Sequence, residues 1–164
     1  MASERKITFD TRFFRDALGS FATGVTIVTT TDGGGNPIGL TANSFNSVSL
    51  EPPIVLWSLM NTSKSMKLFT DKKKFAVHIL GADQINLSNK FASRETDKFE
   101  GVNWSMSEFG LPIIEGCSAV FQCKTMLEQE AGDHVTFFGE VVECVNDTNA
   151  PLIWHNGGYL SLPG

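Results

Sequence analysis

Apolar residues follow a helical period near the start of the chain and a strand-like pattern soon afterwards. Residues 10–21 carry five apolar side chains at helical spacing, and Asp10 or Thr11 is suited to cap such a helix. These apolar residues are Phe13, Phe14, Ala17, Leu18 and Phe21. Gly24 ends the pattern, and the β-branched run 25–31 then leads through the turn residues 32–36 into a second strand over 37–41. The pattern predicts one helix followed by a β-hairpin.

The remainder of the chain alternates short β-prone runs with two amphipathic segments. Strands are predicted over 54–59, 75–80, 116–127 and 134–145, and residues 128–133 join the last two. Helices are predicted over 83–91 and after Thr62 or Ser63, either of which can cap a helix containing Met66, Leu68 and Phe69. The polar segment 92–110 is too long for a simple connection, which indicates a functional loop.

This inventory favours a mainly β fold. It contains six or seven short strands and two or three helices, without the regular alternation of a Rossmann fold. An antiparallel barrel decorated by helices fits it better. The length of 164 residues, with no internal repeat or linker, predicts a single domain over 1–164.

Composition limits which partners and which cellular compartment the protein is expected to have. The net charge of −5 argues against nucleic acid as the main partner. No apolar run approaches the ~18 residues of a membrane helix, and the N-terminus lacks the apolar core of a signal peptide. Cys117, Cys123 and Cys144 leave at least one thiol unpaired and show no metal-binding spacing, so we expect reduced, half-buried thiols in a cytoplasmic protein.

Small polar residues are concentrated between two of the predicted strands. The stretch 39–53 reads Gly39-Leu-Thr-Ala-Asn-Ser-Phe-Asn-Ser-Val-Ser-Leu-Glu-Pro-Pro53. Its hydroxyl, amide and free backbone N–H groups suit a ligand with a phosphate at one end and a polar ring at the other. An ordinary Ser/Asn-rich loop is the alternative.

The three histidines do not form a metal site by spacing. His78, His134 and His155 lie far apart in the sequence, and none is near a Cys or carboxylate at a recognised ligand spacing. His78 is expected to be a hydrogen-bonded histidine within a strand. His134 follows Gly132 and Asp133 at the connection between two predicted strands, and Asp133 is placed to orient its ring. An ordinary hairpin turn is again the alternative.

The order of several motifs resembles the flavin reductase family, the short NAD(P)H-dependent enzymes that supply reduced flavin to two-component monooxygenases. The two motifs that are specific together are Thr41-Ala-Asn-Ser-Phe-Asn-Ser-Val-Ser-Leu-Glu-Pro-Pro53 and Gly132-Asp-His134. Matching pieces also occur, in order, at residues 14–28, 61–65, 75–80, 91–93, 98–99, 139–141, 151–153 and at Tyr159. The resemblance covers nearly the whole chain.

The resemblance implies a split β-barrel of the FMN-binding type, a six-stranded antiparallel Greek key with a few flanking α-helices, acting as a homodimer. It implies FMN or FAD as the flavin and NADH or NADPH as the hydride donor. It also implies a separate flavin-dependent monooxygenase that receives the reduced flavin.

Site residues carried over from the family fall into two groups. Flavin contacts are expected from Thr41, Ala42, Asn43, Ser44, Ser49, Ser58, Leu59, Phe91, Ser93 and Lys98, with Ser63 and Ser65 at the phosphate. Nicotinamide contacts are expected from Gly132 and His134, with Tyr159 near the same cleft. Basic candidates at the phosphate end are restricted to Lys64, Lys67 and Lys98, which leaves the choice between FMN and FAD open.

The chemistry of the reaction limits what these residues must do. Hydride transfer needs stacked rings and no obligatory acid or base, so His134, the one catalytic candidate, is assigned to nicotinamide positioning or proton supply. Donors near the flavin ring would stabilise the charge that grows on reduction. A flavin-binding carrier with a tightly held flavin is the alternative function, and a purely structural barrel is a third.

Overall fold

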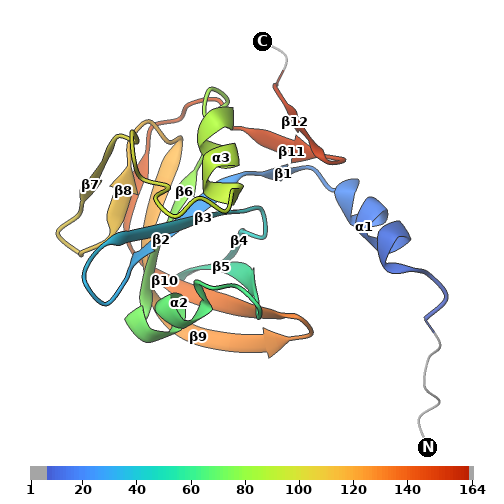
Figure 1. The fold of residues 1–164 in the computed structure, drawn as a ribbon, viewed down its shortest axis with the longest axis horizontal. Coiled ribbons are helices and arrows are strands. Elements are labelled where there is room, and N and C mark those ends of the chain that lie inside the picture. The colour runs from blue at the N-terminus through green and yellow to red at the C-terminus, as the bar shows by residue number, and fades with distance from the viewer. Residues whose placement is uncertain (1–6, 163–164) are drawn as a thin grey trace, which may run out of the picture.

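The computed structural model describes residues 7–162 and confirms the mainly β class (Figure 1). The helices are α1 (Thr11–Gly19), α2 (Met66–Lys72) and α3 (Ile85–Ala92). The strands are β1 (Thr23–Gly24), β2 (Thr26–Thr31), β3 (Pro37–Ala42), β4 (Asn46–Leu50), β5 (Pro53–Met60), β6 (Lys74–Ile79), β7 (Trp104–Met106), β8 (Pro112–Ile114), β9 (Ala119–Ala131), β10 (His134–Asn146), β11 (Ile153–His155) and β12 (Gly158–Leu160). The outermost parts of the predicted domain, 1–6 and 163–164, lie outside the described residues. Within 7–162, no helix is both long and apolar enough to cross a membrane.

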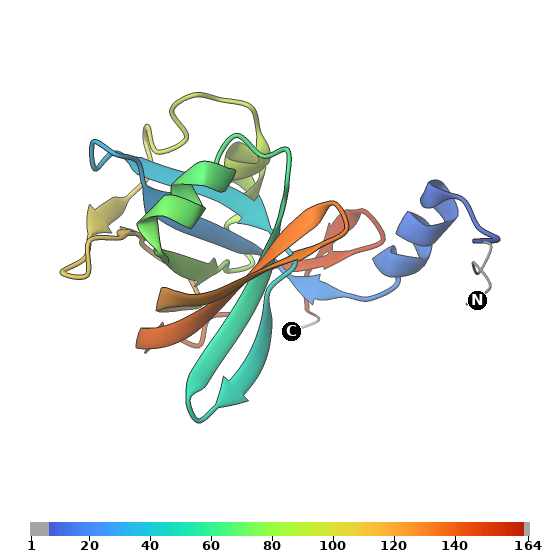
Figure 2. The same cartoon turned by 90° about the horizontal axis from the view of Figure 1, so that it is seen from below.

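Seven strands form the main sheet, in the order β3-β2-β6-β9-β10-β5-β4, and every pairing within it is antiparallel. The predicted count of six strands is therefore wrong. The additional strand β4 lies within the polar stretch 39–53, in which the sequence pattern predicts no strand beyond residue 41. Its main chain pairs with β5, Ser49 opposite Ile54, because ladder hydrogen bonds need no apolar side chains. Figure 2 shows this β4–β5 hairpin, in teal, extending from the rest of the sheet.

Two smaller sheets complete the strand pairing, one of β1, β11 and β12 and one of β7 and β8. These strands have two or three residues each. Such segments are too short to show a hydrophobic period, which explains why the sequence pattern missed them. The predicted connection 128–133 is also shorter than expected, since β9 and β10 continue to Ala131 and from His134.

Strand β2 separates two hydrophobic cores. Ile27 packs in one core with Phe91, and Val28 packs in the other with Phe75. Alternate residues of a strand point to opposite faces, so β2 is buried along its whole length. This double burial accounts for the uninterrupted β-branched run in the sequence.

An aromatic cluster fills the second core. The indole of Trp57 stacks on Phe137 with ring centroids 5.1 Å apart and meets the edges of Phe69 and Phe75 at 4.8 and 5.8 Å. Each such pair contributes about 0.5–1.5 kcal/mol beyond the burial of area. The cluster holds β5, β10 and α2 together beneath the residues described below.

Helix α3 lies against β3, and a glycine allows the close contact. A Cβ atom at Gly39 would stand 2.6 Å from Cε1 of Phe91. The Phe91 ring is fully buried there and meets Phe99 edge-on at 4.9 Å. The hydroxyl of Thr41 donates to the main-chain oxygen of Ser88 at 2.7 Å and ties the same strand to the helix.

His78 is a hydrogen-bonded core histidine, as expected from its strand. Its Nδ1 lies 3.0 Å from the oxygen of Ile27, and its Nε2 accepts from the N–H of Ile114 at 3.1 Å. Complete burial lowers the pKa of His78 to about 4. The ring is therefore neutral and structural.

The cysteines are free, but the expectation that they are half-buried is wrong. Cys117 and Cys123 are buried and Cys144 is exposed. Burial raises the pKa of Cys117 to about 11 and that of Cys123 to about 12. Neither buried thiol is a reactive thiolate at neutral pH.

Candidate functional site

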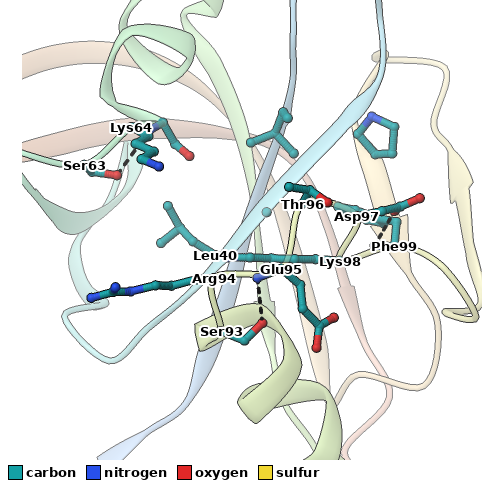
Figure 3. Close-up of a pocket in the computed structure, with 14 residues that line it drawn as sticks. Leu40, Ser63, Lys64, Ser93, Arg94, Glu95, Thr96, Asp97, Lys98 and Phe99 are labelled. Carbon is teal, nitrogen blue, oxygen red and sulfur yellow. Dashed lines mark hydrogen bonds between the residues drawn. The ribbon is translucent and has the colours of Figure 1, made fainter.

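A cavity of about 640 Å³ opens between three segments that lie far apart in the sequence (Figure 3). Its walls are the first half of β3, the Ser63–Ser65 loop before α2, and the loop that follows α3. The lining residues are Pro37, Ile38, Gly39, Leu40, Ser63, Lys64, Ser65, Ser93, Arg94, Glu95, Thr96, Asp97, Lys98 and Phe99. Residues 93–99, the first part of the polar segment 92–110, form one wall of this cavity.

Hydroxyl and cationic groups share one side of this cavity. Figure 3 shows the Arg94 side chain extending to the side on which Ser63 and Lys64 lie, whereas Glu95 and Asp97 point elsewhere. Ser65 precedes the first turn of α2 and makes no side-chain cap hydrogen bond. Two hydroxyls, an ammonium and a guanidinium form a donor set suited to a phosphate group.

The loop over residues 93–99 is held by its own polar groups. The hydroxyl of Ser93 donates to the oxygen of Lys90 at 2.7 Å, and Lys98 Nζ donates to the oxygen of Phe91 at 2.7 Å. Both contacts satisfy carbonyls at the C-terminal end of α3. Partial burial lowers the pKa of Lys98, an effect that the charge of Glu95 opposes. Ser93 and Lys98 therefore line the cavity and fix the conformation of its loop by bonding to the end of α3.

Beyond the cavity, hydroxyls of the β3–β4 connection, β5 and β10 form a connected set. Ser44 Oγ bridges to β5 by donating to the oxygen of Ser58 at 3.0 Å and accepting from its N–H at 2.9 Å. Ser58 Oγ in turn lies 2.8 Å from the hydroxyl of Thr136. Ala42 and Asn43 continue the strip between Thr41 and Ser44, with Asn43 exposed.

The β9–β10 turn carries the Gly132-Asp133-His134 motif. Gly132 has φ +61°, a conformation that favours glycine. His134 Nδ1 lies 2.7 Å from a carboxylate oxygen of Asp133, and this hydrogen bond together with the histidine's charge lowers the pKa of Asp133. The turn is an ordinary hairpin in its backbone, and it also fixes the orientation of an imidazole that remains 41% exposed.

Segment 58–65 connects the turn to the cavity. The N–H of Asn61 donates to the oxygen of Asp133 at 2.9 Å, and its side-chain amide donates to the oxygen of Gly132 at 3.3 Å. Two residues further on, Ser63 lines the cavity. A short stretch of chain, from Asn61 to Ser63, thus links the His134 turn to the cavity.

Some predicted residues lie elsewhere. Phe91 is fully buried behind β3, and Leu59 points into the second core. Ser49 lies in β4 and outside the cavity lining. The hydroxyl of Tyr159 is bonded to Ser88 and Asn89 of α3, at 2.9 and 2.8 Å, so the structure places it on that helix and not beside His134.

Arg94 was missed by the sequence argument. The family motif ended at Ser93 and resumed at Lys98, which left the arginine between them without a role. Its position in a long polar loop, immediately after a predicted site residue, was the available signal. Lys67, which was considered for the phosphate end, instead pairs with Asp71 on the exposed side of α2 and does not line the cavity.

The flavin reductase-like domain model matches residues 18–163, so the chain belongs to that family. The chain is 43% identical over 150 residues to FMN reductase (NADH) SmoA of Agrobacterium fabrum, an alignment covering 92% of this chain and 85% of that protein.

Two further relatives extend the comparison. The chain is 43% identical to the reductase component of a flavin-dependent trigonelline monooxygenase from Acinetobacter baylyi, over 92% of this chain and 48% of that protein. It superimposes with a TM-score of 0.90 and 33% identity on the Streptomyces globisporus NADH:FAD oxidoreductase SgcE6, in complex with NAD and FAD fragments, covering 97% and 98% of the two chains. The chain spans about half the length of some curated relatives.

Proposed function

We propose that this protein is an NADH-dependent flavin reductase that passes reduced flavin to a separate monooxygenase. The observation that carries the proposal is the continuity of the site. The turn that presents an oriented imidazole is hydrogen-bonded to Asn61, and residues 63–65 of the same loop line a cavity with phosphate-binding donors. Family membership and the names of the relatives support the same activity.

The phosphate end of FMN or FAD fits the donors in the cavity. Ser63 and Ser65 supply hydroxyls, and Lys64 and Arg94 supply positive charge on the same side. Charge-assisted hydrogen bonds to a phosphate are about twice as strong as neutral ones. The added charge of Arg94 removes the shortage of basic groups noted from the sequence.

The ring of the flavin fits the strip of small residues between the cavity and the turn. Thr41, Ala42 and Ser44 have short side chains, and the contacts of Thr41 and Ser44 keep these groups close to the backbone. A flat ring can therefore lie near the main chain. When bound, the flavin supplies the redox chemistry by accepting a hydride from NADH.

The residues of the chain bind and orient the two reactants. His134, held by Asp133, would position the nicotinamide or supply a proton at the exposed end of the strip. Ser58 and Thr136 would hold the β5–β10 surface beneath the ring. This assignment asks for no general base in the hydride step.

The wider assembly follows from the same family. We propose a homodimer, a sheet that curls into a split barrel, and action in the cytoplasm beside a monooxygenase that takes the reduced flavin. The reductase component of the Acinetobacter system supports the last of these. The contact of β3 with β5, near the open edge strand β4, supports the curled sheet.

The test is a spectrophotometric assay of the purified chain with NADH and FMN, repeated with FAD and with NADPH. We expect NADH oxidation that requires both the protein and added flavin, whereas mixtures that lack either one oxidise NADH far more slowly. No flavin-dependent oxidation with either nucleotide would refute the proposal. A yellow protein that keeps its flavin through dialysis and ignores both nucleotides would favour the carrier instead.

A further inference from the structure

Helix α1 and the residues on either side of it present large apolar side chains that are exposed to solvent. None of its residues is buried. The exposed fraction runs from 48% for Phe14 to 75% for Phe21 in the set Ile7, Phe9, Phe13, Phe14, Leu18 and Phe21. Exposed large apolar side chains in such a cluster mark a surface that is covered in the working protein.

The short length of α1 also indicates that the helix needs a packing partner. It has nine residues, whereas isolated helices shorter than about 12–15 residues are marginal in water. Asp10 caps its first turn by accepting from the N–H of Phe13 at 2.8 Å, which contributes about 1 kcal/mol. A cap of that size does not replace tertiary packing, so the apolar face needs a permanent partner.

The body of the same chain, residues 23–162, is not that partner. The oxygen of Gly19 accepts from the N–H of Asn156 at 2.9 Å, which ties the end of α1 to the β11–β12 turn. A Cβ at Gly19 would lie 3.3 Å from Oδ1 of Asn156, so the contact is close. Figures 1 and 2 both show α1 standing away from the sheet beyond this contact.

We propose that α1 of each copy packs against the body of a second copy, so that the two chains exchange helices reciprocally. This inference rests on the proposed homodimer and specifies how it is built. At about 200 Å² per aromatic or aliphatic side chain, the six exposed residues present roughly 700 Å². A standard interface needs about 800 Å² from each partner, and two exchanged helices with their acceptor surfaces exceed it.

The shape and charge of the helix favour a protein surface as its acceptor. The apolar positions 13, 14, 17 and 18 span more than 100° of the helix, which is wider than the seam used when two helices pair with each other. A membrane-surface helix is typically rich in Lys and Arg. Here Arg12 and Arg15 are offset by Asp10 and Asp16, and the chain carries a net charge of −5.

The bodies also offer apolar surface to receive the helix. Leu50, at the end of β4, is 94% exposed, and Val48 in the same strand is 47% exposed. Val142 and Val145 in β10 are 44% and 47% exposed. These positions identify where cross-links from α1 are worth seeking first.

The test compares Phe13→Glu with the matched control Arg15→Glu by analytical ultracentrifugation. Glutamate at position 13, the third helical residue, forms a favourable capping arrangement and so leaves the helix itself intact. We expect a dimeric wild type, a dimer dissociation constant raised at least ~30-fold by Phe13→Glu, and little change in Arg15→Glu on the polar face. Near-ultraviolet circular dichroism of both variants should match the wild type, because α1 contacts little of its own body.

Photo-cross-linking from position 14, in unlabelled protein mixed with ¹⁵N-labelled protein, identifies what α1 touches. Mixed-isotope products joined to residues 23–162 are expected. Products within one chain, products joining α1 to α1, or vesicle binding lost in Phe13→Glu would overturn the inference. A dimer unaffected by Phe13→Glu would also overturn it and leave the proposed homodimer and flavin reduction standing. A monomeric wild type would overturn both the homodimer and the exchange, whereas the NADH assay tests the activity separately.

Discussion

Lys98 donates a hydrogen bond from Nζ to the main-chain oxygen of Phe91 at 2.7 Å. This contact joins a loop that lines the cavity to the end of the helix behind it. Lys98 therefore stabilises the loop that lines the cavity. The guanidinium of Arg94 extends to the side of the cavity where Ser63 and Lys64 lie. We therefore assign a positioning role to Lys98 and a phosphate-binding role to Arg94.

Replacing Lys98 by methionine tests the positioning role. The variant keeps the apolar stem but removes a charged donor, a contact that contributes ~1.5–3 kcal/mol. We expect FMN to bind ~10-fold more weakly while kcat at saturating FMN changes by less than ~2-fold. Lys67→Met on the exposed side of α2 is the control and should leave both values unchanged. A fall in kcat with unchanged FMN affinity would contradict this role.

Arg94→Gln tests the binding role. Loss of the guanidinium should weaken FMN binding by ~10-fold or more, the scale of one charge-assisted contact. Riboflavin lacks the phosphate, so its affinity should stay within ~2-fold of the wild-type value. Fluorescence titration measures both, and Arg15→Gln on α1 provides the same substitution outside the cavity. Equal weakening of FMN and riboflavin would show that Arg94 does not meet the phosphate.

His134→Ala separates the two reactants. The imidazole lies at the β9–β10 turn, away from the cavity, and is oriented by Asp133. We expect KM for NADH to rise ~10-fold, a loss of ~1.4 kcal/mol in nicotinamide binding, while the FMN dissociation constant stays unchanged. Asp133→Asn should give a smaller change in the same direction. Parallel losses for both ligands in steady-state kinetics and titration would argue against the assignment.

Gly39→Ala tests the contact of α3 with β3. The added methyl would stand 2.6 Å from the Phe91 ring, so the helix must shift. Overpacking of this kind costs about 1–3 kcal/mol of unfolding free energy, and the displaced helix should also weaken FMN binding. Urea denaturation measures the stability. Gly33→Ala in the β2–β3 turn, where the methyl would meet nothing within 4 Å, should cost far less.

His78 predicts an acid-sensitive fold. Its pKa is lowered to about 4 by burial, against about 6.5 in the unfolded chain. Between these values the unfolded state binds the extra proton, so stability is full above pH 6.5 and falls as the pH drops towards 4, at up to ~1.4 kcal/mol per pH unit. Urea denaturation at several pH values should show this slope in wild type and His155→Gln. His78→Gln should be less stable at pH 7 but lack this part of the slope.

The elements whose hydrophobic pattern extends over many residues were predicted well from sequence. The helix behind Asp10, the hairpin of β2 and β3, and the strands around Trp57, Phe75 and Phe137 all lie close to their predicted positions. Each depends on side chains that repeat over several turns or strand residues. Strand β4 was missed because its ladder is formed by main-chain groups in a run of polar residues.

Several residues of the candidate site were identified from sequence, but their contacts with one another were not. Ser63, Ser65, Ser93 and Lys98 were identified and line one cavity. Sequence could not show that Lys98 is committed to Phe91, or that Tyr159 is committed to α3, because both contacts depend on how α3 sits on the sheet.

The sequence by itself determined the mainly β class, the amphipathic character of α1 and the motif set that marks the family. These properties follow from local periodicity and from residue identity, which the linear chain contains. Only the tertiary structure decided that Arg94 joins Ser63 and Lys64, that segment 58–65 reaches the His134 turn, and that the face of α1 lacks a partner within the described chain. Those relationships depend on long-range strand pairing and helix docking, which bring together residues whose separation along the chain gives no sign of contact.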